Sequence, residues 1–357
     1  MNRRSVLSLL ATLPLAPTAF ATLVDAEPQD ALRQAWEAWK TQHLDTNGRV
    51  VDRLQKDASH SEGQGYGMVL AERMNDPEAF EAMFRWAEQN LAVRPDALLA
   101  WRWLPDAPIP VPDTNNASDG DLFYAWALMG AAARFDRPEY MVRATAIARD
   151  LDALCVVDFP GHAGAYLFLP GASGFETENG FVINPSYYML RAREELAQAA
   201  GTPRLAGAAA NGDVLLAEIA RHGPVPDWLT VSSDGLHRPA EFSANSGYEA
   251  LRVPLWMAWS GKFGHPVVTN AAGSGFSTRT AGDGAVATVI DYDSGEVLET
   301  SSDAGYRAII ALAACAGGAE PGSAMPPFDP GQSYYPATLH LFSYLAQLEM
   351  APQCFPV

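Results

Sequence analysis

Very short breaks between successive amphipathic stretches constrain the fold of this chain more than any other feature. Residues 61–74 meet the next stretch at Asp76-Pro77, and residues 119–134 meet theirs at Asp136-Arg137-Pro138. An aspartate followed by proline is a typical start of a helix. Helices joined by such short links lie side by side and antiparallel. The sequence therefore predicts a mostly helical fold in which helical hairpins are the building unit.

Other segments repeat the pattern. Leu32, Trp36 and Trp39 recur at helical spacing in residues 30–44, and this stripe is expected to pack in the core. Further helices are predicted over residues 185–199, 211–221, 246–259, 304–316 and 335–350, with a kink at Pro254 in the third of these. Strand-like residues are few, and they indicate small hairpins that include residues 166–169 and, around a turn at 293–295, residues 287–298.

The first 21 residues resemble an export signal. Arg3 and Arg4 precede an apolar run, and Ala19-Phe20-Ala21 is a typical cleavage site. The adjacent arginines leave both general secretion and twin-arginine export open. No Gly/Ser-rich or Pro-rich linker divides the remainder, so residues 22–357 are expected to form one domain that works in the periplasm or outside the cell.

Charge limits the partners of the mature chain. The formal net charge is -18, and removal of the signal peptide takes away two arginines and no acid, which leaves -20. Nucleic acids and anionic membranes bind clustered Lys and Arg, so a neutral or cationic ligand fits this chain better. No later run is apolar for the roughly 18 to 20 residues that span a bilayer. Cys155, Cys315 and Cys354 allow at most one intramolecular disulfide, and its pairing stays open.

Residues 59–68 contain the first candidate for chemistry. Glu62 stands among small residues at the start of a predicted helix, followed by Gly63, Gly65 and Gly67. Each glycine weakens a helix by about 1 kcal/mol relative to alanine, so their presence indicates that other groups approach this backbone closely. The alternative is that Ser61 and Glu62 only cap the helix.

Two further stretches carry acids. Asp119 and Asp121 flank Gly120 at the head of an apolar helix, where N-capping is the alternative to a functional role, and Glu249 lies three residues before Arg252. Hydrolysis of a glycosidic bond requires one protonated carboxyl for the leaving oxygen and, in an inverting enzyme, a second carboxylate that activates water. An acid packed beside a helix and aromatic side chains can have its pKa raised by desolvation, which suits Glu62 to the first role.

Residues 59–68, 116–122 and 246–253 together resemble glycoside hydrolase family 8, and within it the periplasmic endoglucanases that accompany bacterial cellulose synthase. The resemblance extends from about Trp36 to Tyr334-Tyr335. It implies an all-α fold, an (α/α)6 barrel of six helical hairpins in two rings with small β-hairpin insertions, and a substrate cleft across one end.

Site residues follow from the same resemblance. Glu62 matches the general acid of the family, and Asp119 matches the aspartate that holds the sugar ring in a distorted shape at the cleavage point. The family's Tyr-Asp-Ala-Ile-Arg segment, whose aspartate is the catalytic base, reads Tyr248-Glu249-Ala250-Leu251-Arg252 here. The extra methylene of glutamate moves the carboxylate by roughly 1.5 Å, and errors of about 1 Å can cost a hundredfold in rate. Glu249 is therefore either the base or a structural partner of Arg252.

Aromatic side chains are expected to bind the sugar faces. Trp101 and Trp103 alternate just before the loop that leads to Asp119, and the family match makes Trp103 and Tyr187 candidates for cleft-lining residues, with a purely structural place in the core as the alternative. Tyr248 is a candidate for orienting the attacking water or the neighbouring carboxylate, and Arg252 is, like Tyr248, a candidate for substrate binding.

The sequence thus predicts an inverting endo-β-1,4-glucanase, a cellulase that acts on β-1,4-glucan without metal or cofactor. The histidines and cysteines have no metal-ligand spacing, and no phosphate-binding loop or nucleophilic serine elbow is present. The resemblance also implies trimming of nascent glucan beside the cellulose synthase export machinery. The alternatives are a chitosanase or xylanase on the same fold, or a glucan-binding protein that has lost catalysis.

Overall fold

The structure, a computed structural model, describes residues 28–273, 284–318 and 322–355, so the predicted signal peptide lies outside the described residues. In these ranges the chain forms eleven α-helices: α1 Pro28–His43, α2 Ser61–Arg73, α3 Pro77–Asn90, α4 Ser118–Arg134, α5 Pro138–Leu154, α6 Leu190–Ala200, α7 Pro203–His222, α8 Val253–Trp259, α9 Pro266–Ala272, α10 Ala304–Ala316 and α11 Tyr334–Met350. None of them is both long enough and apolar enough to cross a membrane.

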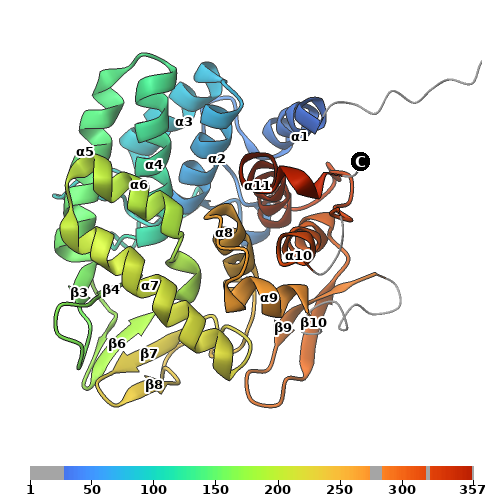
Figure 1. Ribbon diagram of the computed structural model, residues 1–357. Coiled ribbons are helices and arrows are strands. Elements are labelled where there is room, and N and C mark those ends of the chain that lie inside the picture. The colour runs from blue at the N-terminus through green and yellow to red at the C-terminus, as the bar shows by residue number, and fades with distance from the viewer. Residues whose placement is uncertain (1–27, 274–283, 319–321, 356–357) are drawn as a thin grey trace, which may run out of the picture.

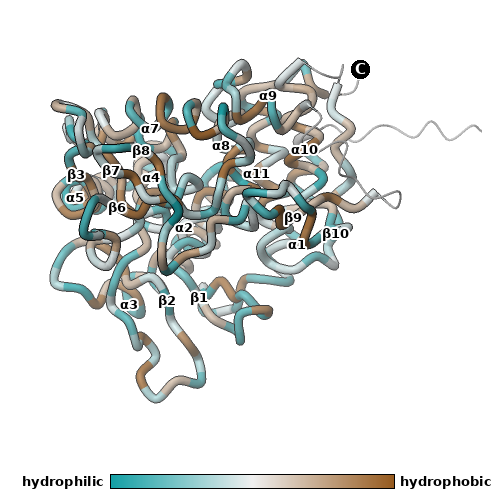
Figure 2. Tube along the Cα trace, turned by 90° about the horizontal axis from the view of Figure 1, so that it is seen from below, coloured by the Kyte–Doolittle hydropathy of each residue, from teal (hydrophilic) through white to brown (hydrophobic). Residues whose placement is uncertain are grey.

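Helix α11, near the C-terminus, lies next to α1 and α8 (Figure 1), and contacts between helices close an inner ring. Helices α2, α4, α6, α8 and α11 contact one another in that order, and α11 returns to contact α2. Seen from below, α2, α4, α8 and α11 lie near the middle, with α3, α5, α7, α9 and α1 around them (Figure 2). Helix α10 packs against α8, α9 and α11. The predicted all-α (α/α)6 barrel is confirmed.

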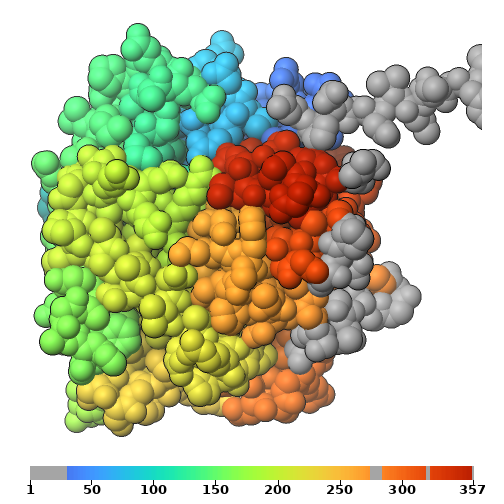
Figure 3. All heavy atoms as spheres, viewed as in Figure 1, coloured from blue at the N-terminus to red at the C-terminus, as the bar shows by residue number. Residues whose placement is uncertain are grey.

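Local signals explain why the helices begin where they do. The Asp76 side chain accepts a hydrogen bond from the Ala79 backbone N–H at the start of α3, and Pro77 occupies the first turn. Proline likewise stands in the first turn of α5, α7, α8 and α9. The predicted stripe of α1 is buried, with Trp36 and Trp39 stacked at 5.2 Å between ring centroids. On the face of the molecule that Figure 3 shows, helices α6, α7, α8, α9 and α11 lie next to one another.

Three predicted helices differ in extent. Residues 185–187 form a 3-10 turn, η2, and α6 begins only at Leu190. Helix α7 begins at Pro203, eight residues before the predicted start, because proline is favourable in a first turn. The expected kink at Pro254 is wrong, since α8 begins at Val253 and the proline lies in its first turn.

Short strands connect the helices: β1 Ser59–His60, β2 Arg102–Trp103, β3 Val156–Asp158, β4 Tyr166–Phe168, β5 Glu176–Thr177, β6 Gly180–Ile183, β7 Leu229–Ser232, β8 Gly235–His237, β9 Val286–Ile290 and β10 Val297–Ser301. Strand β1 pairs with β2, β3 with β4 and β9 with β10, all antiparallel. The two predicted hairpins are confirmed. The four-stranded sheet β5-β6-β7-β8 is an addition that the sequence pattern did not indicate.

A disulfide joins Cys315 at the end of α10 to Cys354 near the C-terminus, which settles the pairing left open by the sequence, and Cys155 is a buried free thiol. The bridge closes a loop with a sequence separation of 39, and restriction of the unfolded chain then stabilises the fold by about 4 kcal/mol. We expect replacement of both cysteines by serine to lower the melting temperature by roughly 5–10 °C in calorimetry. Reductant should lower the melting temperature of the unaltered chain and leave that of the double variant unchanged; equal melting temperatures would contradict the prediction.

Candidate active site

The helices of the inner ring bring their N-terminal ends together. Glu62 lies in the first turn of α2, Asp119 lies in the first turn of α4, and Arg252 is the residue directly before α8. The N-terminal end of a helix carries a partial positive charge, which favours carboxylates there. Residues far apart in the sequence therefore meet at one end of the ring, where the N-terminal ends of the helices favour ionised carboxylates.

Glycines set the distance between α2 and α4. A Cβ atom on Gly65 would lie 2.8 Å from the Tyr124 backbone nitrogen, and one on Gly120 would lie 2.6 Å from the Glu62 backbone nitrogen. Any side chain at either position would push the two helices apart. The predicted close approach is confirmed, and it holds the backbones of Glu62 and Asp119 next to each other.

Arg252 joins the three predicted acids. Its Nη1 donates hydrogen bonds to Glu62 Oε2 and to the Tyr66 hydroxyl, the latter at 2.7 Å. Its Nη2 donates to Asp119 Oδ2 at 3.2 Å and to Glu249 Oε2. The guanidinium is buried, with 1 % of its side chain exposed. One cation thus faces three carboxyl groups, so a full set of ionised acids would leave the cluster with excess negative charge.

Glu249 is held on one side and open on the other. Its Oε2 accepts hydrogen bonds from Asn184 Nδ2 at 3.2 Å and Ser186 Oγ at 3.0 Å, in addition to the bond from Arg252. Its side chain is 36 % exposed and that of Glu62 is 21 % exposed, whereas Asp119 is buried. Glu62 contacts Nη1 of Arg252 and Glu249 contacts Nη2, so the two exposed carboxyl groups lie on different nitrogens of the same guanidinium.

Burial changes the acidity of the cluster. Removal from water raises the pKa of Glu62, and the nearby charge of Glu249 raises it further, while Arg252 opposes both effects. Burial also raises the pKa of Asp119 well above its usual range, against the opposing effect of Arg252. Glu62 therefore keeps its proton to higher pH than an exposed glutamate, which a general acid requires.

This geometry of paired acids agrees with comparisons to known proteins. The sequence profile of glycosyl hydrolases family 8 matches residues 14–349. A probable endoglucanase from Novacetimonas hansenii is 34% identical over 353 residues, which cover 96% of this chain and 99% of that protein. The chain belongs to glycosyl hydrolase family 8. It is therefore a glycoside hydrolase.

Solved structures agree with the family 8 assignment. An endo-β-1,4-glucanase from Acetobacter xylinum superposes with a TM-score of 0.81 at 32% identity, covering 90% of this chain and 99% of that one. A family 8 endoglucanase from Klebsiella pneumoniae gives a TM-score of 0.79 at 29% identity, covering 88% and 99%. A reducing-end-xylose releasing exo-oligoxylanase gives a TM-score of 0.69 at 18% identity and shares the fold alone.

Capping does not explain the acids of this family 8 site. The residue before α2 is His60, and the one before α4 is Ala117; neither helix has a side-chain cap bond. Asp121 instead accepts hydrogen bonds from the Leu99 backbone N–H at 2.8 Å and from Asn116 Nδ2 at 2.9 Å. Asp121 thus ties the loop before β2 to the start of α4.

The predicted aromatic residues divide into two groups. Trp101 and Trp103 are half-buried, the first directly before β2 and the second in it; β2 pairs with β1, which ends two residues before Glu62. Trp101 stacks on His60 at 6.0 Å between centroids, and Trp103 packs edge-on against Trp86 at 5.6 Å. Trp101 is thereby close in the fold to the segment that carries Glu62, whereas Trp103 also supports the core.

The tyrosines differ from the prediction at one point. Tyr187 lies beside the cluster, with its ring centroid 5.7 Å from the Arg252 guanidinium carbon. The Tyr248 hydroxyl instead donates to Glu299 Oε2 at 3.0 Å, on β10, and no described contact links it to the Glu249 carboxylate. Orientation of the carboxylate by Tyr248 is therefore not supported, because its side chain is bonded to the β9–β10 hairpin. Orientation of the attacking water by Tyr248 stays a prediction.

Sequence reasoning missed several supporting residues. Ser186 binds both Arg252 and Glu249, and Tyr335 places its ring 6.0 Å from the guanidinium and donates from its hydroxyl to the Tyr248 carbonyl at 2.8 Å. Asn184-Pro185-Ser186 was available as a signal, since an Asn-Pro pair indicates a turn. The place of Tyr335 had no signal, because it depends on the return of α11 to the ring.

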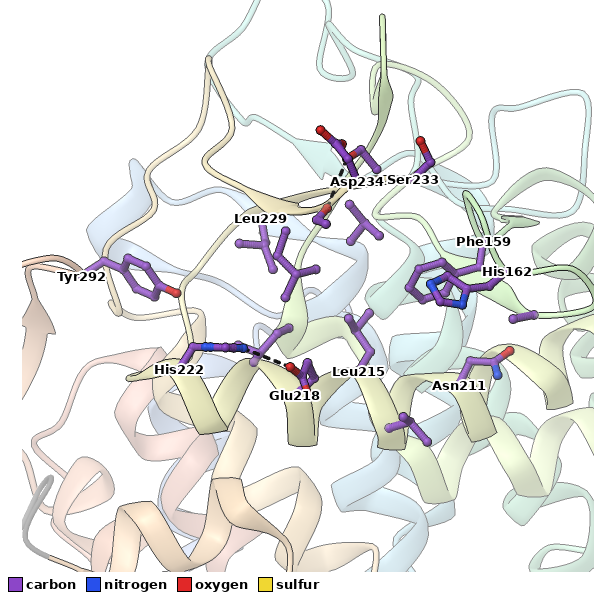
Figure 4. Close-up of a pocket in the computed structure, with 17 residues that line it drawn as sticks. Phe159, His162, Asn211, Leu215, Glu218, His222, Leu229, Ser233, Asp234 and Tyr292 are labelled. Carbon is purple, nitrogen blue, oxygen red and sulfur yellow. Dashed lines mark hydrogen bonds and ion pairs between the residues drawn. The ribbon is translucent and has the colours of Figure 1, made fainter.

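A separate cavity of about 750 Å³ lies between α7 and the β7–β8 hairpin (Figure 4). Leu215 of α7 and Leu229 of β7 line it from opposite sides, His162 stands at one end and Tyr292 at the other, and Glu218 pairs with His222 at its edge. None of the residues bonded to Arg252 lines it. The cavity therefore takes no part in the carboxylate cluster.

Proposed function

We propose that this protein is an inverting endo-β-1,4-glucanase with Glu62 as general acid, Glu249 as general base and Asp119 as the residue that supports the distorted sugar ring. The observation that carries the proposal is the convergence of these three acids on Arg252. The 32% identical endo-β-1,4-glucanase from Acetobacter xylinum supports the substrate.

The reaction follows from the two exposed carboxyl groups. Glu62 donates its proton to the glycosidic oxygen as the bond to the anomeric carbon breaks. Water attacks that carbon from the opposite face and gives its proton to Glu249. Glu62 is left ionised and Glu249 protonated, and exchange with solvent restores both. Arg252 stabilises the carboxylate that forms on Glu62, because its Nη1 already contacts that oxygen.

Glu249 fits the base role because only one of its oxygens is occupied. Arg252, Ser186 and Asn184 all bind Oε2, and no hydrogen bond from the described residues reaches Oε1. Together with the 36 % exposure of the side chain, this leaves Oε1 available to an attacking water. The bonds to Oε2 fix the direction in which the other oxygen points.

Two substitutions separate the base role of Glu249 from a structural one. Glu249→Gln keeps an oxygen that can accept from Arg252 but cannot take up a proton, so we expect kcat on carboxymethyl cellulose to fall by about 10³-fold. Glu249→Asp withdraws the carboxylate by one methylene, and we expect a loss of about a hundredfold. Reducing-end assays measure both. Near-normal activity of the glutamine variant would assign Glu249 to structure alone.

The substrate is tested with a panel of polymers. The mature protein should release reducing ends from carboxymethyl cellulose and not from xylan or chitosan, and proton NMR of the first products should show the α-anomer. Cleavage of xylan alone would show that the protein is a xylanase, and cleavage of chitosan alone would show that it is a chitosanase. If the protein binds glucan and cleaves no polymer, the conclusion would be that it is a glucan-binding protein without catalysis.

We also propose that the protein is exported to the periplasm or secreted and that it trims glucan near the cellulose synthase export machinery. The signal-like residues 1–21 and the disulfide, which forms in oxidising compartments, support export. Cell fractionation with antibody detection tests it. Recovery of the protein only from the cytoplasm would contradict both parts.

A further inference from the structure

Asp227, directly before Trp228 and β7, holds the backbone of the segment that carries Glu249 and Arg252. Its Oδ1 accepts hydrogen bonds from the Gly247 N–H at 2.9 Å and from the Ala250 N–H at 2.8 Å. Its own N–H donates to the Asn245 carbonyl at 2.8 Å. Three bonds thus join one residue to both ends of a six-residue segment.

This segment needs an outside acceptor. Residues 245–249 are neither helix nor strand, and the 3-10 turn that follows, Ala250–Arg252, has no side-chain cap of its own. The first N–H groups of a helical turn lack partners within the turn, and a carboxylate is among the best acceptors for them. Asp227 supplies that acceptor from 23 residues away in sequence.

The fit around the carboxylate is close. A Cβ atom on Gly247 would lie 2.4 Å from Asp227 Oδ2, so the carboxylate reaches this backbone only because position 247 has no side chain. On the other side, Ser246 pairs with Ile290 of β9 through two backbone bonds at 3.0 and 2.8 Å. The segment before Glu249 is therefore fixed between Asp227 and β9.

Charge makes this contact dependent on pH. Burial raises the pKa of Asp227, the hydrogen bonds from Ala250 and Gly247 lower it, and the charges of Glu249 and Arg252 raise and lower it in turn; the net effect is a pKa of about 6. Glu249 and Arg252 are the charged groups that face it. The carboxylate is thus ionised above about pH 6 and protonated below, where its hold on the two N–H groups weakens.

We propose that Asp227 is a positioning residue whose ionised carboxylate keeps the Gly247–Arg252 turn, and with it Glu249 and Arg252, in the arrangement that hydrolysis requires. The inference rests on the proposed function, since it concerns the placement of the proposed base. Asp227 acts through the turn and does not itself touch the sugar.

Two variants and a control test the proposal on carboxymethyl cellulose. Asp227→Ala removes the acceptor, and we expect kcat to fall about 30- to 100-fold with KM changed less than threefold, as for a displacement near 1 Å. Asp227→Asn keeps one acceptor oxygen but not the charge, so kcat at pH 7 should fall to about the value that the unaltered protein has well below pH 6. Asp234→Ala, an exposed aspartate in the β7–β8 turn, should match the unaltered protein.

The pH profile and amide exchange give independent readouts. The unaltered protein should lose activity as the pH falls through about 6, and this decline should be absent in Asp227→Asn. Hydrogen exchange of the Gly247 and Ala250 amides should be faster in Asp227→Ala than in Asp234→Ala. A folded alanine variant with unchanged kcat, or an asparagine variant with an unchanged acid limb, would overturn the proposal.

The same assays distinguish a wrong positioning role for Asp227 from a wrong assignment of the protein as a glucanase. If the unaltered protein and Asp234→Ala cleave no polymer, the proposed function fails, and exchange at Gly247 still reports on the contact. If both cleave cellulose and Asp227→Ala cleaves it equally well, only the positioning role fails.

Discussion

Glu62→Gln is expected to lower kcat on carboxymethyl cellulose by at least about 10³-fold while glucan binding persists. Glutamine has nearly the shape of glutamic acid and can still accept from Arg252, but it cannot deliver a proton to the leaving oxygen. Reducing-end release measures the loss, and isothermal titration with cellohexaose measures the retained binding.

The pH dependence of activity tests whether Glu62 supplies the proton to the leaving oxygen. Because burial raises the pKa of Glu62, the acid form persists above the usual range, and activity is lost as the pH rises through that raised value. An aryl cellobioside with a good leaving group needs little protonation, so it should be hydrolysed by the variant far faster than cellulose is. A variant that retains a tenth of the activity on cellulose would remove Glu62 from the acid role.

Arg252→Met is expected to have the second largest effect, on both stability and rate. The change leaves Glu62, Asp119 and Glu249 without the cation that they share, and loss of one partner from a buried ion pair costs about 3–5 kcal/mol. We expect a lower urea midpoint and a loss of hydrolysis of about 10³-fold or more.

Arg252→Lys refines this prediction. Lysine keeps the charge but has a single ammonium, which cannot occupy the places of Nη1 and Nη2 together. We expect most of the stability to return and most of the activity to remain absent. Arg221→Lys, at an exposed pair on α7, serves as the control. Equal activity of the lysine variant and the unaltered protein would mean that charge alone suffices at position 252.

Local signals made part of this structure predictable. Asp76-Pro77 predicts the start of α3 within a few residues. The glycines after Glu62 indicate a close approach of another segment, and Gly65 does lie against the backbone of α4, as Gly120 lies against that of α2. The start of α8 was missed because Ser246 is paired with β9, a partner 44 residues away, and no local pattern encodes that pairing.

The candidate site was predictable in its acids and not in their connections. Glu62, Asp119 and Glu249 stand in motifs that can be recognised one at a time. The contact of Glu249 with Arg252 spans only 3 residues and was one of the alternatives that the sequence offered. The contacts of Glu62 and Asp119 with Arg252 span 190 and 133 residues, so they depend on closure of the ring. Asp227 escaped notice because an aspartate before a short strand looks like an ordinary turn residue.

The contacts of α11 with α1 and α2 have a consequence for biosynthesis. Trp39 donates to Thr338 across 299 residues at 2.9 Å, and Tyr335 completes the surroundings of Arg252. A nascent chain that has not yet emerged as far as α11 lacks these contacts, so the glucan-cutting centre cannot assemble during translation of the first three hundred residues. We expect hydrolytic competence to arise only after α11 has been synthesised, and chains that are truncated before α11 to be inactive.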